Sequence, residues 1–389
     1  MAKAFLVKDK EKKVEYGHPW IFRSDIEQVD GSFIPGDVVD IYSKKNRFLG
    51  RGYINPKSQI AIRMLTYEHE EINYDFLYKR ILSAWEYRKR VADVNSCRVV
   101  FAESDFIPAL IVDKFSDYLV LQTLSLGIDR YKEMITDILN EIIKPAGIFE
   151  RNDVPVRELE GLEQKKGFLK GKFVTKIEMV ENGIKFIVDI ENGQKTGYFL
   201  DQKENRAAIE PLVKGAKVLD CFSHTGSFAL HAAHYGASSV LGIDISEHAV
   251  QCAAQNAVLN GLEKSCGFEV SNTFDKLREY YDNGEKFDVI ILDPPAFTKS
   301  RDAVQGAIRG YKEINLRAMK ITNSGGFLVT CSCSHHVDPE LFMDILYNAA
   351  IDARKRVRLI EYRSQSKDHP ILLAAEETQY LKCAILQIT

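Results

Sequence analysis

The 389-residue sequence lacks several features that would assign a protein to a class by themselves. It has seven cysteines, an odd number with no C-x-x-C pair, which excludes a disulfide or zinc framework built on such pairs. It has no run of 18 apolar residues and a charged N-terminus, so we expect neither a membrane helix nor a secretory signal. The histidines show no metal-ligand spacing, so we expect no metal. These absences predict a cytoplasmic protein whose thiols are reduced.

The sequence also has little net charge. The formal charge is −3 and the pI is near 6.3, which argues mildly against a protein that coats nucleic acid nonspecifically, although a local basic face could still bind RNA. A hydrophobic content of 45% and a charged content of 28% are ordinary for a globular protein with a sizeable core. The length predicts two or three domains.

The strongest pattern lies between Lys217 and Gln255. A short apolar run leads to Asp220, a turn follows at 223–226, and a helical pattern comes next. A second apolar run, at 240–243, ends in Asp244. This order, in which a strand, a glycine turn, a helix and a second strand with a terminal acid follow one another, is typical of the first half of a doubly wound nucleotide-binding sheet.

The same stretch has too few glycines for a dinucleotide. A pyrophosphate site would need G-x-G-x-x-G, but only Gly226 is present in the turn. We therefore expect S-adenosylmethionine, which has a ribose and an adenine but no phosphate. Gly226 would let the backbone approach the ligand, and Asp244 would accept hydrogen bonds from the ribose hydroxyls.

Two later strands also end in residues that can carry chemistry. The apolar run at 287–292 leads directly into Asp293 and two prolines, which give a stiff strand tip where a flat ring could lie. The run that begins at Gly325 ends in Cys331 and Cys333, two thiols on the same side of an extended strand. Strand ends in an open α/β sheet share one edge, so we expect Asp293 and one of the thiols in one cleft with Asp220 and Asp244.

The remaining chain predicts two further domains. Short apolar runs separated by turn residues over 1–70 indicate a small β-barrel. The interleaved cations and aromatics of this barrel could bind RNA or merely be solvated. Residues 71–188 predict a helix followed by strands, a helix and strands, a central α+β domain. The third domain, 189–389, would carry the nucleotide-binding sheet, closed by an antiparallel pair at its C-terminus.

The order of these motifs resembles a known family. GHPWIF and PGDVVDIY resemble the PUA domain; DCFSHTGSFALHAA, LGIDIS, ILDPPAF and GGFLVTCSCS resemble four methyltransferase motifs, preceded by TGYFLDQKENR. The whole chain is similar to the bacterial 23S ribosomal RNA cytosine C5-methyltransferases, which join a PUA-like barrel, a central α+β domain and a class I, Rossmann-like S-adenosylmethionine-dependent domain. The resemblance implies 5-methylcytosine formation in 23S rRNA, and a homodimer.

The resemblance also implies roles for single residues. Cys333 would be the nucleophile that adds to C6 of cytosine, and Asp293 would hold N3 and the exocyclic amine. Pro295 stands where relatives carry a second cysteine, so Cys331, a water or Asp293 could remove the C5 proton. The implied cofactor residues are Asp220, Ser223 and Gly226 at the methionine end, Asp244 at the ribose, Asn272 near the adenine, and Tyr198, Phe199, Gln202 and Arg206 in the segment before the first strand.

Two other functions compete with this interpretation. An Asp-Pro-Pro tip also suits methylation of a ring or exocyclic nitrogen, which needs no thiol. The chain could instead be a noncatalytic RNA-binding assembly factor that retains the fold. The cysteine in the sixth motif favours the covalent reaction over the first alternative, and the acids at the strand ends argue against the second.

Overall fold

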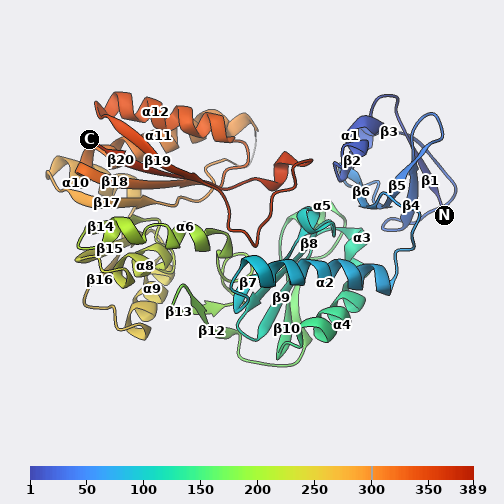
Figure 1. Cartoon of the computed structure of the whole chain (residues 1–389), viewed down its shortest axis with the longest axis horizontal. Helices are drawn as coiled ribbons and strands as arrows, with labels where there is room; N and C mark the ends of the chain where they lie inside the picture. The colour runs from blue at the N-terminus through green and yellow to red at the C-terminus, as the bar shows by residue number, and fades with distance from the viewer. Residues whose placement is uncertain (299–300) are drawn as a thin grey trace. The chain divides into compact units, whose positions relative to one another are not determined.

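The computed structural model of the chain describes residues 1–298 and 301–389 (Figure 1). They form two compact units. The first unit comprises Met1–Met179, Val188–Leu200 and Lys367–Thr378, and the second comprises Val180–Ile187, Asp201–Ser366 and Gln379–Thr389. The domain bounds expected from the sequence, 1–70, 71–188 and 189–389, stay a prediction. Within the described ranges, no helix combines the length and the apolar character needed to cross a membrane.

The first unit begins with a six-stranded sheet in the order β2-β6-β5-β4-β1-β3. Buried aliphatic side chains such as Leu6, Ile41 and Ile62 alternate along its strands and form a small core. Strands β2 and β3 lack a clear apolar run, because they are short and hold few fully buried residues. The strands are β1 (Lys3–Leu6), β2 (Trp20–Phe22), β3 (Ile26–Asp30), β4 (Val38–Tyr42), β5 (Phe48–Ile54) and β6 (Ile60–Thr66), with the short helix α1 (Glu11–Glu15) between β1 and β2.

A second sheet of the first unit has five strands in the order β11-β10-β9-β8-β7. Helix α2 (Tyr74–Val91) begins at Asn73, whose side chain accepts a hydrogen bond from Phe76 N at 3.1 Å and caps the helix. Its apolar face packs with α4 and β7 into one core. The remaining elements are β7 (Ser96–Phe101), β8 (Leu110–Phe115), β9 (Tyr118–Thr123), α3 (Leu126–Asp129), α4 (Lys132–Ile143), β10 (Gly147–Asn152), α5 (Val156–Leu159) and β11 (Lys165–Lys170).

The chain then forms a hairpin of β12 (Lys176–Glu181) and β13 (Ile184–Asp189) and enters the seven-stranded sheet of the second unit. The strand order is β16-β15-β14-β17-β18-β20-β19. The first five strands are parallel, and β20 and β19 are antiparallel, which confirms the expected closing pair. The strands are β14 (Lys217–Cys221), β15 (Ser239–Asp244), β16 (Cys266–Val270), β17 (Phe287–Leu292), β18 (Thr322–Ser332), β19 (Val357–Arg363) and β20 (Lys382–Ile388).

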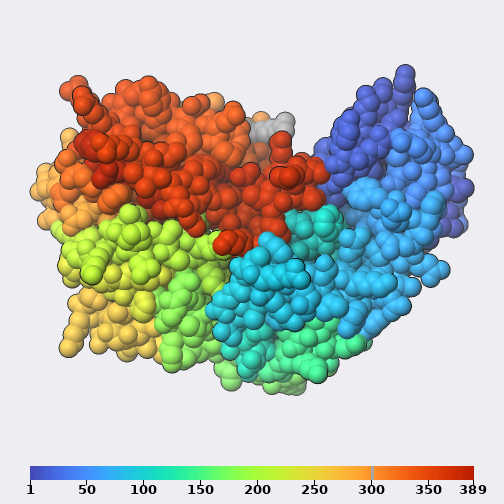
Figure 2. All heavy atoms as spheres, viewed as in Figure 1, coloured from blue at the N-terminus to red at the C-terminus, as the bar shows by residue number. Residues whose placement is uncertain are grey.

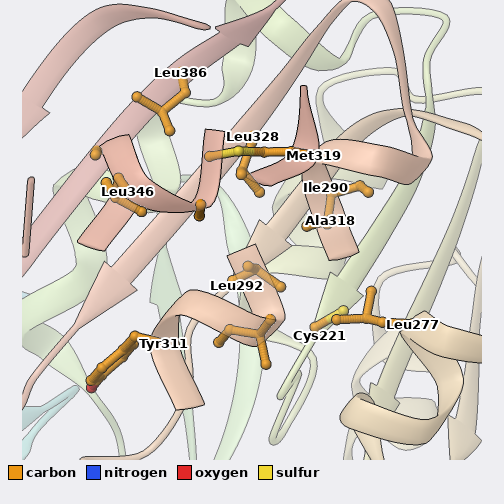
Figure 3. Close-up of a cluster of buried hydrophobic side chains, with 14 of the residues drawn as sticks. Cys221, Leu277, Ile290, Leu292, Tyr311, Ala318, Met319, Leu328, Leu346 and Leu386 are labelled. Carbon is orange, nitrogen blue, oxygen red and sulfur yellow. The ribbon is translucent and has the colours of Figure 1, made fainter. Parts of the chain in front are cut away.

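Helices cover both faces of this sheet (Figure 1). Helices α11 and α12 pack side by side on one face. The C-terminal part of the chain, to which they belong, is drawn in orange to red in the space-filling view (Figure 2). The apolar sides of these two helices bury the main core of the unit, part of which Figure 3 shows, including Leu328, Met319 and Tyr311. The helices are α6 (Lys203–Ala207), α7 (Glu210–Val213), α8 (Ser227–His234), α9 (Glu247–Leu259), α10 (Thr273–Asp282), α11 (Val304–Ile321) and α12 (Pro339–Ala353).

The strand order positions the site. From β14 the chain adds β15 and then β16 on one side, and it then adds β17 and β18 on the other side of β14. The strand order therefore reverses between β14 and β17, and the carboxyl ends of these two strands form a topological switch point. The α/β fold predicted from the apolar runs is therefore confirmed, as is the small β domain before it.

Candidate active site

Asp220 is the buried acid near the end of β14. One oxygen, Oδ2, accepts hydrogen bonds from Ser223 Oγ at 2.6 Å and from Ala229 N at 3.0 Å. The other oxygen, Oδ1, is buried and has no partner within the described chain. Burial raises the pKa of Asp220 to about 7, and the nearby carboxylates of Asp293 and Asp244 add to this effect. An acidic group with one orphaned buried oxygen can receive a cationic ligand group.

Three residues of the loop after β14 adopt left-handed backbone conformations. Phe222, His224 and Gly226 have positive φ values of 62°, 50° and 82°. A Cβ at Gly226 would lie 2.8 Å from Cζ of Phe268, a side chain of β16. The glycine is therefore needed for the left-handed turn and for close packing against Phe268, whereas the sequence suggested close approach of a ligand.

Asp244 ends β15 and orders the same loop. Its Oδ2 accepts a hydrogen bond from His224 N and its Oδ1 accepts one from Ser246 N, both at 2.9 Å. The side chain is half-buried, and an ionised carboxylate has further lone pairs for ligand hydroxyls. This geometry leaves Asp244 able to accept hydrogen bonds from a ribose.

Asn272 follows β16 and caps helix α10. Its Oδ1 accepts hydrogen bonds from Phe274 N at 2.9 Å and from Asp275 N at 3.4 Å. The sequence suggested that this oxygen would accept from an adenine amine. Because both of its lone pairs are already used, the exposed amide nitrogen is the group left for a ligand, and it can only donate.

Asp293 follows β17 and is held by a residue that lies far away in the sequence. Gln202, from the segment before the first strand of the sheet, donates from Nε2 to Oδ1 of Asp293 at 2.9 Å. Asn205 Nδ2 in turn donates to Oε1 of Gln202 at 2.6 Å, which fixes the orientation of the amide. The structure therefore brings Gln202 to the acid expected to hold the base.

The two thiols of β18 differ in environment. Cys331 lies within the strand, is fully buried and sits beside Cys383; its hydrogen bond with Cys383 and its burial raise the pKa of the thiol well above the usual range. Cys333 follows the strand end and is partly exposed. Its Sγ lies 3.8 Å from the carbonyl oxygen of Pro294, the residue after Asp293. The structure therefore places the Cys333 thiol beside the backbone of the Asp-Pro-Pro turn, whereas the buried Cys331 thiol interacts with Gln202 and with the charge of Asp293.

The backbone next to Cys333 is fixed by residues that the sequence did not single out. Ser334 Oγ accepts a hydrogen bond from Phe297 N at 3.1 Å and lies 2.9 Å from the Tyr311 hydroxyl. Lys382, the first residue of β20, donates from Nζ to the Ser334 carbonyl oxygen at 2.8 Å. These partners come from a loop, a helix and a strand that lie far apart in the sequence, so no local motif could have revealed them.

Three other predicted cofactor residues have contacts that the sequence did not indicate. Tyr198 and Phe199 belong to the first unit, where Tyr198 is buried and the Lys195 ammonium lies 4.5 Å from the centre of the Phe199 ring. Arg206, on α6, forms a buried ion pair in which Nε donates to Glu181 Oε1 at 2.7 Å. This pairing gives Arg206 a structural role in the second unit and leaves its predicted cofactor contact a proposal.

The residues at β14 and β15 fit the expected S-adenosylmethionine. The orphaned buried oxygen of Asp220 suits the ammonium of a methionine group, and Asp244 suits a ribose diol. Ser223 is committed to Asp220, so it acts there by orienting the carboxylate. No group in this part of the site requires a phosphate.

Comparison with known proteins gives matches to two domain families and to relatives over nearly the whole chain. Residues 5–67 match the PUA-like domain, and residues 162–375, more than half of the chain, match the S-adenosylmethionine-dependent methyltransferase family. Ribosomal RNA large subunit methyltransferase I of Aeromonas salmonicida is 42% identical over 98% of each chain. The protein of the same name from Photobacterium profundum is 42% identical over 97% of each chain.

Solved structures share the fold over the whole length. A protein described as an S-adenosylmethionine-dependent methyltransferase from Streptococcus mutans covers 100% of both chains with a TM-score of 0.84 at 19% identity. A methyltransferase solved in complex with S-adenosylhomocysteine covers 100% of both chains with a TM-score of 0.87 at 19% identity. With the sequence relatives, these matches show that the chain belongs to the family of the ribosomal RNA large subunit methyltransferase I proteins, whose cofactor is S-adenosylmethionine.

Proposed function

We propose that this chain transfers a methyl group to C5 of a cytosine in 23S ribosomal RNA, through a covalent bond between Cys333 and C6 of the base. The observation that carries the proposal is the partly exposed thiol of Cys333 beside the Asp-Pro-Pro turn, with its Sγ 3.8 Å from the Pro294 oxygen. A nitrogen methyltransferase would need the acid but no thiol. The names of the relatives support ribosomal RNA of the large subunit as the substrate.

The need for a thiol follows from the chemistry of the base, because C5 of cytosine is a poor nucleophile. When the Cys333 thiolate adds to C6, a C–S bond forms and the C5–C6 π electrons make C5 nucleophilic. S-adenosylmethionine supplies the methyl group that C5 then receives. Loss of the C5 proton returns its electron pair to the C5–C6 bond, the C–S bond breaks, and Cys333 leaves as a thiolate.

Asp293 stabilises the ring while Cys333 is attached. Its carboxyl group would bond N3 and the exocyclic amine, where charge develops when the thiolate adds. The hydrogen bond from Gln202 to Oδ1 holds the carboxyl group at the end of β17. Holding the acid in place before the base arrives lowers the cost of reorganisation during the reaction.

Three groups were candidates for removal of the C5 proton: Cys331, a water and Asp293. The burial of Cys331 and its hydrogen bond to Cys383 argue against Cys331, because both keep its thiol protonated. We therefore propose a water or Asp293 for this step. Cofactor contacts by Asp220, Ser223, Gly226, Asp244, Asn272, Tyr198, Phe199, Gln202 and Arg206 remain part of the proposal, as do a homodimer and a cytoplasmic location.

The test is nucleoside mass spectrometry of ribosomal RNA from cells with and without the protein. We expect one 5-methylcytidine to be lost from 23S rRNA without the protein and restored by the wild-type chain but not by Cys333→Ala. Loss of a nitrogen-methylated nucleoside would instead identify the first alternative function. Unchanged modification in cells that lack the protein would favour a noncatalytic assembly factor.

A further inference from the structure

Lys382 is a buried cation that forms no ion pair with a carboxylate of the described residues. It is the first residue of β20 and lies opposite Ser332, the last residue of β18, in the antiparallel pair. Its side chain is 1% exposed, and Nζ donates to the Ser334 oxygen at 2.8 Å and to the Tyr380 oxygen at 2.9 Å. In the described ranges no carboxylate lies within 4.0 Å of this ammonium. The two carbonyls leave one N–H of the ammonium for another acceptor.

Burying an unpaired ammonium costs free energy, because the charge loses its hydration. Burial lowers the pKa of Lys382 to about 8, and interactions with Cys333 and Asp338 oppose that change. The group is therefore mostly protonated at neutral pH. A core that needed only to anchor a loop could use a neutral amide, so the charge requires its own explanation.

Two groups that can carry negative charge, Cys333 and Asp338, interact with the charge of Lys382. Asp338 is exposed, and its Oδ1 accepts a hydrogen bond from Leu341 N at 2.8 Å to cap helix α12. The phenol of Tyr311 is bonded to Ser334. Cys383, the residue after Lys382, lies in the strand interior beside Cys331. Cys333 is partly exposed and directly precedes Ser334, whose carbonyl oxygen accepts a hydrogen bond from Lys382.

We propose that Lys382 is a positioning residue for the reaction: it fixes the backbone after β18 and supplies the positive charge that favours the Cys333 thiolate. The thiol proton passes to solvent water, and the ammonium stays protonated. This inference rests on the proposed role of Cys333 as the nucleophile, but it can be tested on the thiol itself without any turnover.

The first test follows alkylation of the wild-type protein with iodoacetamide across pH, resolved by peptide mass spectrometry. Cys252, a partly exposed thiol on α9, is the internal control in the same sample. With each rate normalised to its value at high pH, we expect Cys333 to reach half of its maximum about one pH unit or more below Cys252. A Cys333 midpoint equal to or above that of Cys252 would overturn the proposal.

The second test uses Lys382→Gln, which keeps a donor for the two carbonyls but removes the charge, and Lys382→Met, which removes both. The Cys333 midpoint should move up by about one pH unit or more in both variants, while the Cys252 midpoint stays in place. If one variant fails to fold, as judged by its melting temperature, the other and the wild-type measurement decide. A midpoint that does not move in a folded variant contradicts the charge role.

The pH dependence of the methylation rate distinguishes a role of the Lys382 charge from a merely structural role. Lys382→Gln should lose most of its activity at pH 7 and recover toward the wild-type rate as the pH rises and the thiolate forms, whereas a structural defect would lower the rate equally at each pH. The outcomes also separate this inference from the proposed function. If Cys333→Ala remains active, the proposed function fails, and the alkylation midpoints still decide whether Lys382 acts on the thiol.

Discussion

The two halves of the strand-end edge in the second unit are built differently. On the β14–β15 side, Asp220 and Asp244 are held by groups within about 20 residues of them, most of which are backbone amides. On the β17–β18 side, Asp293 is held by Gln202, and the backbone after Cys333 is held by Lys382. The first half is a local motif, whereas the second depends on side chains from distant segments.

The difference suits the two tasks proposed for these halves. On the β14–β15 side, nearby backbone amides hold the carboxylates of Asp220 and Asp244, so their oxygens are already in place for a cofactor without side chains from distant segments. A nucleophile and an acid that must meet one base have to be aligned to a fraction of an ångström, and buried side chains from neighbouring elements provide that alignment. Substitutions in the first half should therefore change cofactor affinity, and those in the second should change the rate of the chemical step.

The largest effect is expected for Cys333→Ala. Removal of the nucleophile should lower methylation of RNA by on the order of 10³-fold or more and leave S-adenosylhomocysteine affinity unchanged, because the thiol lies in the half proposed to bind the base. Methylation rates and calorimetry measure the two quantities. Cys252→Ala, which removes a partly exposed thiol from α9, is the matched control and should act like the wild type. A near-normal rate for Cys333→Ala would eliminate the covalent reaction.

Asp293→Asn should have the next largest effect. The substitution keeps the shape and a partner for Gln202 but removes the carboxyl group that can give N3 a proton as negative charge develops there, so we expect a loss of about 10²–10³-fold in the rate constant at saturating RNA. The Kd for S-adenosylhomocysteine should change little. If this variant instead loses cofactor affinity and keeps its rate constant, the proposed division between the two halves is wrong.

Asp244→Ala should weaken cofactor binding and change the rate constant little, the reverse of what we expect for Asp293→Asn. Loss of a carboxylate that accepts charge-assisted hydrogen bonds costs about 1.5–3 kcal/mol, so the Kd for S-adenosylhomocysteine should rise roughly tenfold to 100-fold. The rate at saturating S-adenosylmethionine should fall much less. Asp275→Ala, at an acid on α10 whose side chain is 76% exposed, is the control, and an equal loss of affinity there would show that the effect is not specific to the site.

The smallest effect is the pH dependence of binding that Asp220 produces. Its pKa of about 7 in the free protein, raised by burial, should fall when a cationic group pairs with it. S-adenosylhomocysteine affinity should therefore rise by up to tenfold per pH unit between pH 5 and 7, level off above pH 7, and be accompanied by proton release in calorimetry. In Asp220→Asn this rise should disappear, and a rise that persists there would assign it to another group.

The raised pKa of Asp220 also determines how its contribution to the free energy of unfolding changes with pH. Because the folded-state pKa of Asp220 lies above the ordinary value of 3.8, the folded protein binds this proton more tightly than the unfolded chain does. The contribution of Asp220 to the free energy of unfolding is thus complete below pH 3.8 and is lost as the pH rises toward about 7.

The local character of the first half explains why the sequence revealed it. Asp220, Gly226 and Asp244 follow apolar runs at short spacings, so periodicity alone predicts their place at the strand ends. The sequence nevertheless predicts only part of the reason for a glycine at position 226. The ring of Phe268 fills the space beside it, and that residue lies 42 positions further along the chain.

The second half could be predicted only in part. The apolar strand before Asp293 revealed the acid, and strand alternation showed that the two cysteines share a side. Alternation could not show that β18 stops at Ser332 and leaves Cys331 buried, and only the family resemblance selected Cys333. Gln202 and Lys382 lie 91 and 49 positions from Asp293 and Cys333, so their contacts exist only in the folded chain.

The most direct test of the covalent bond between Cys333 and the base uses RNA in which the target cytidine carries fluorine at C5. After methylation no proton remains at C5 to be removed, so the C–S bond should persist and the complex should survive denaturation. We expect mass spectrometry to find the nucleotide on the peptide that contains Cys333, only when S-adenosylmethionine is present, and not in Cys333→Ala. A stable complex through another residue, or none with RNA that the protein methylates normally in its unfluorinated form, would contradict the account.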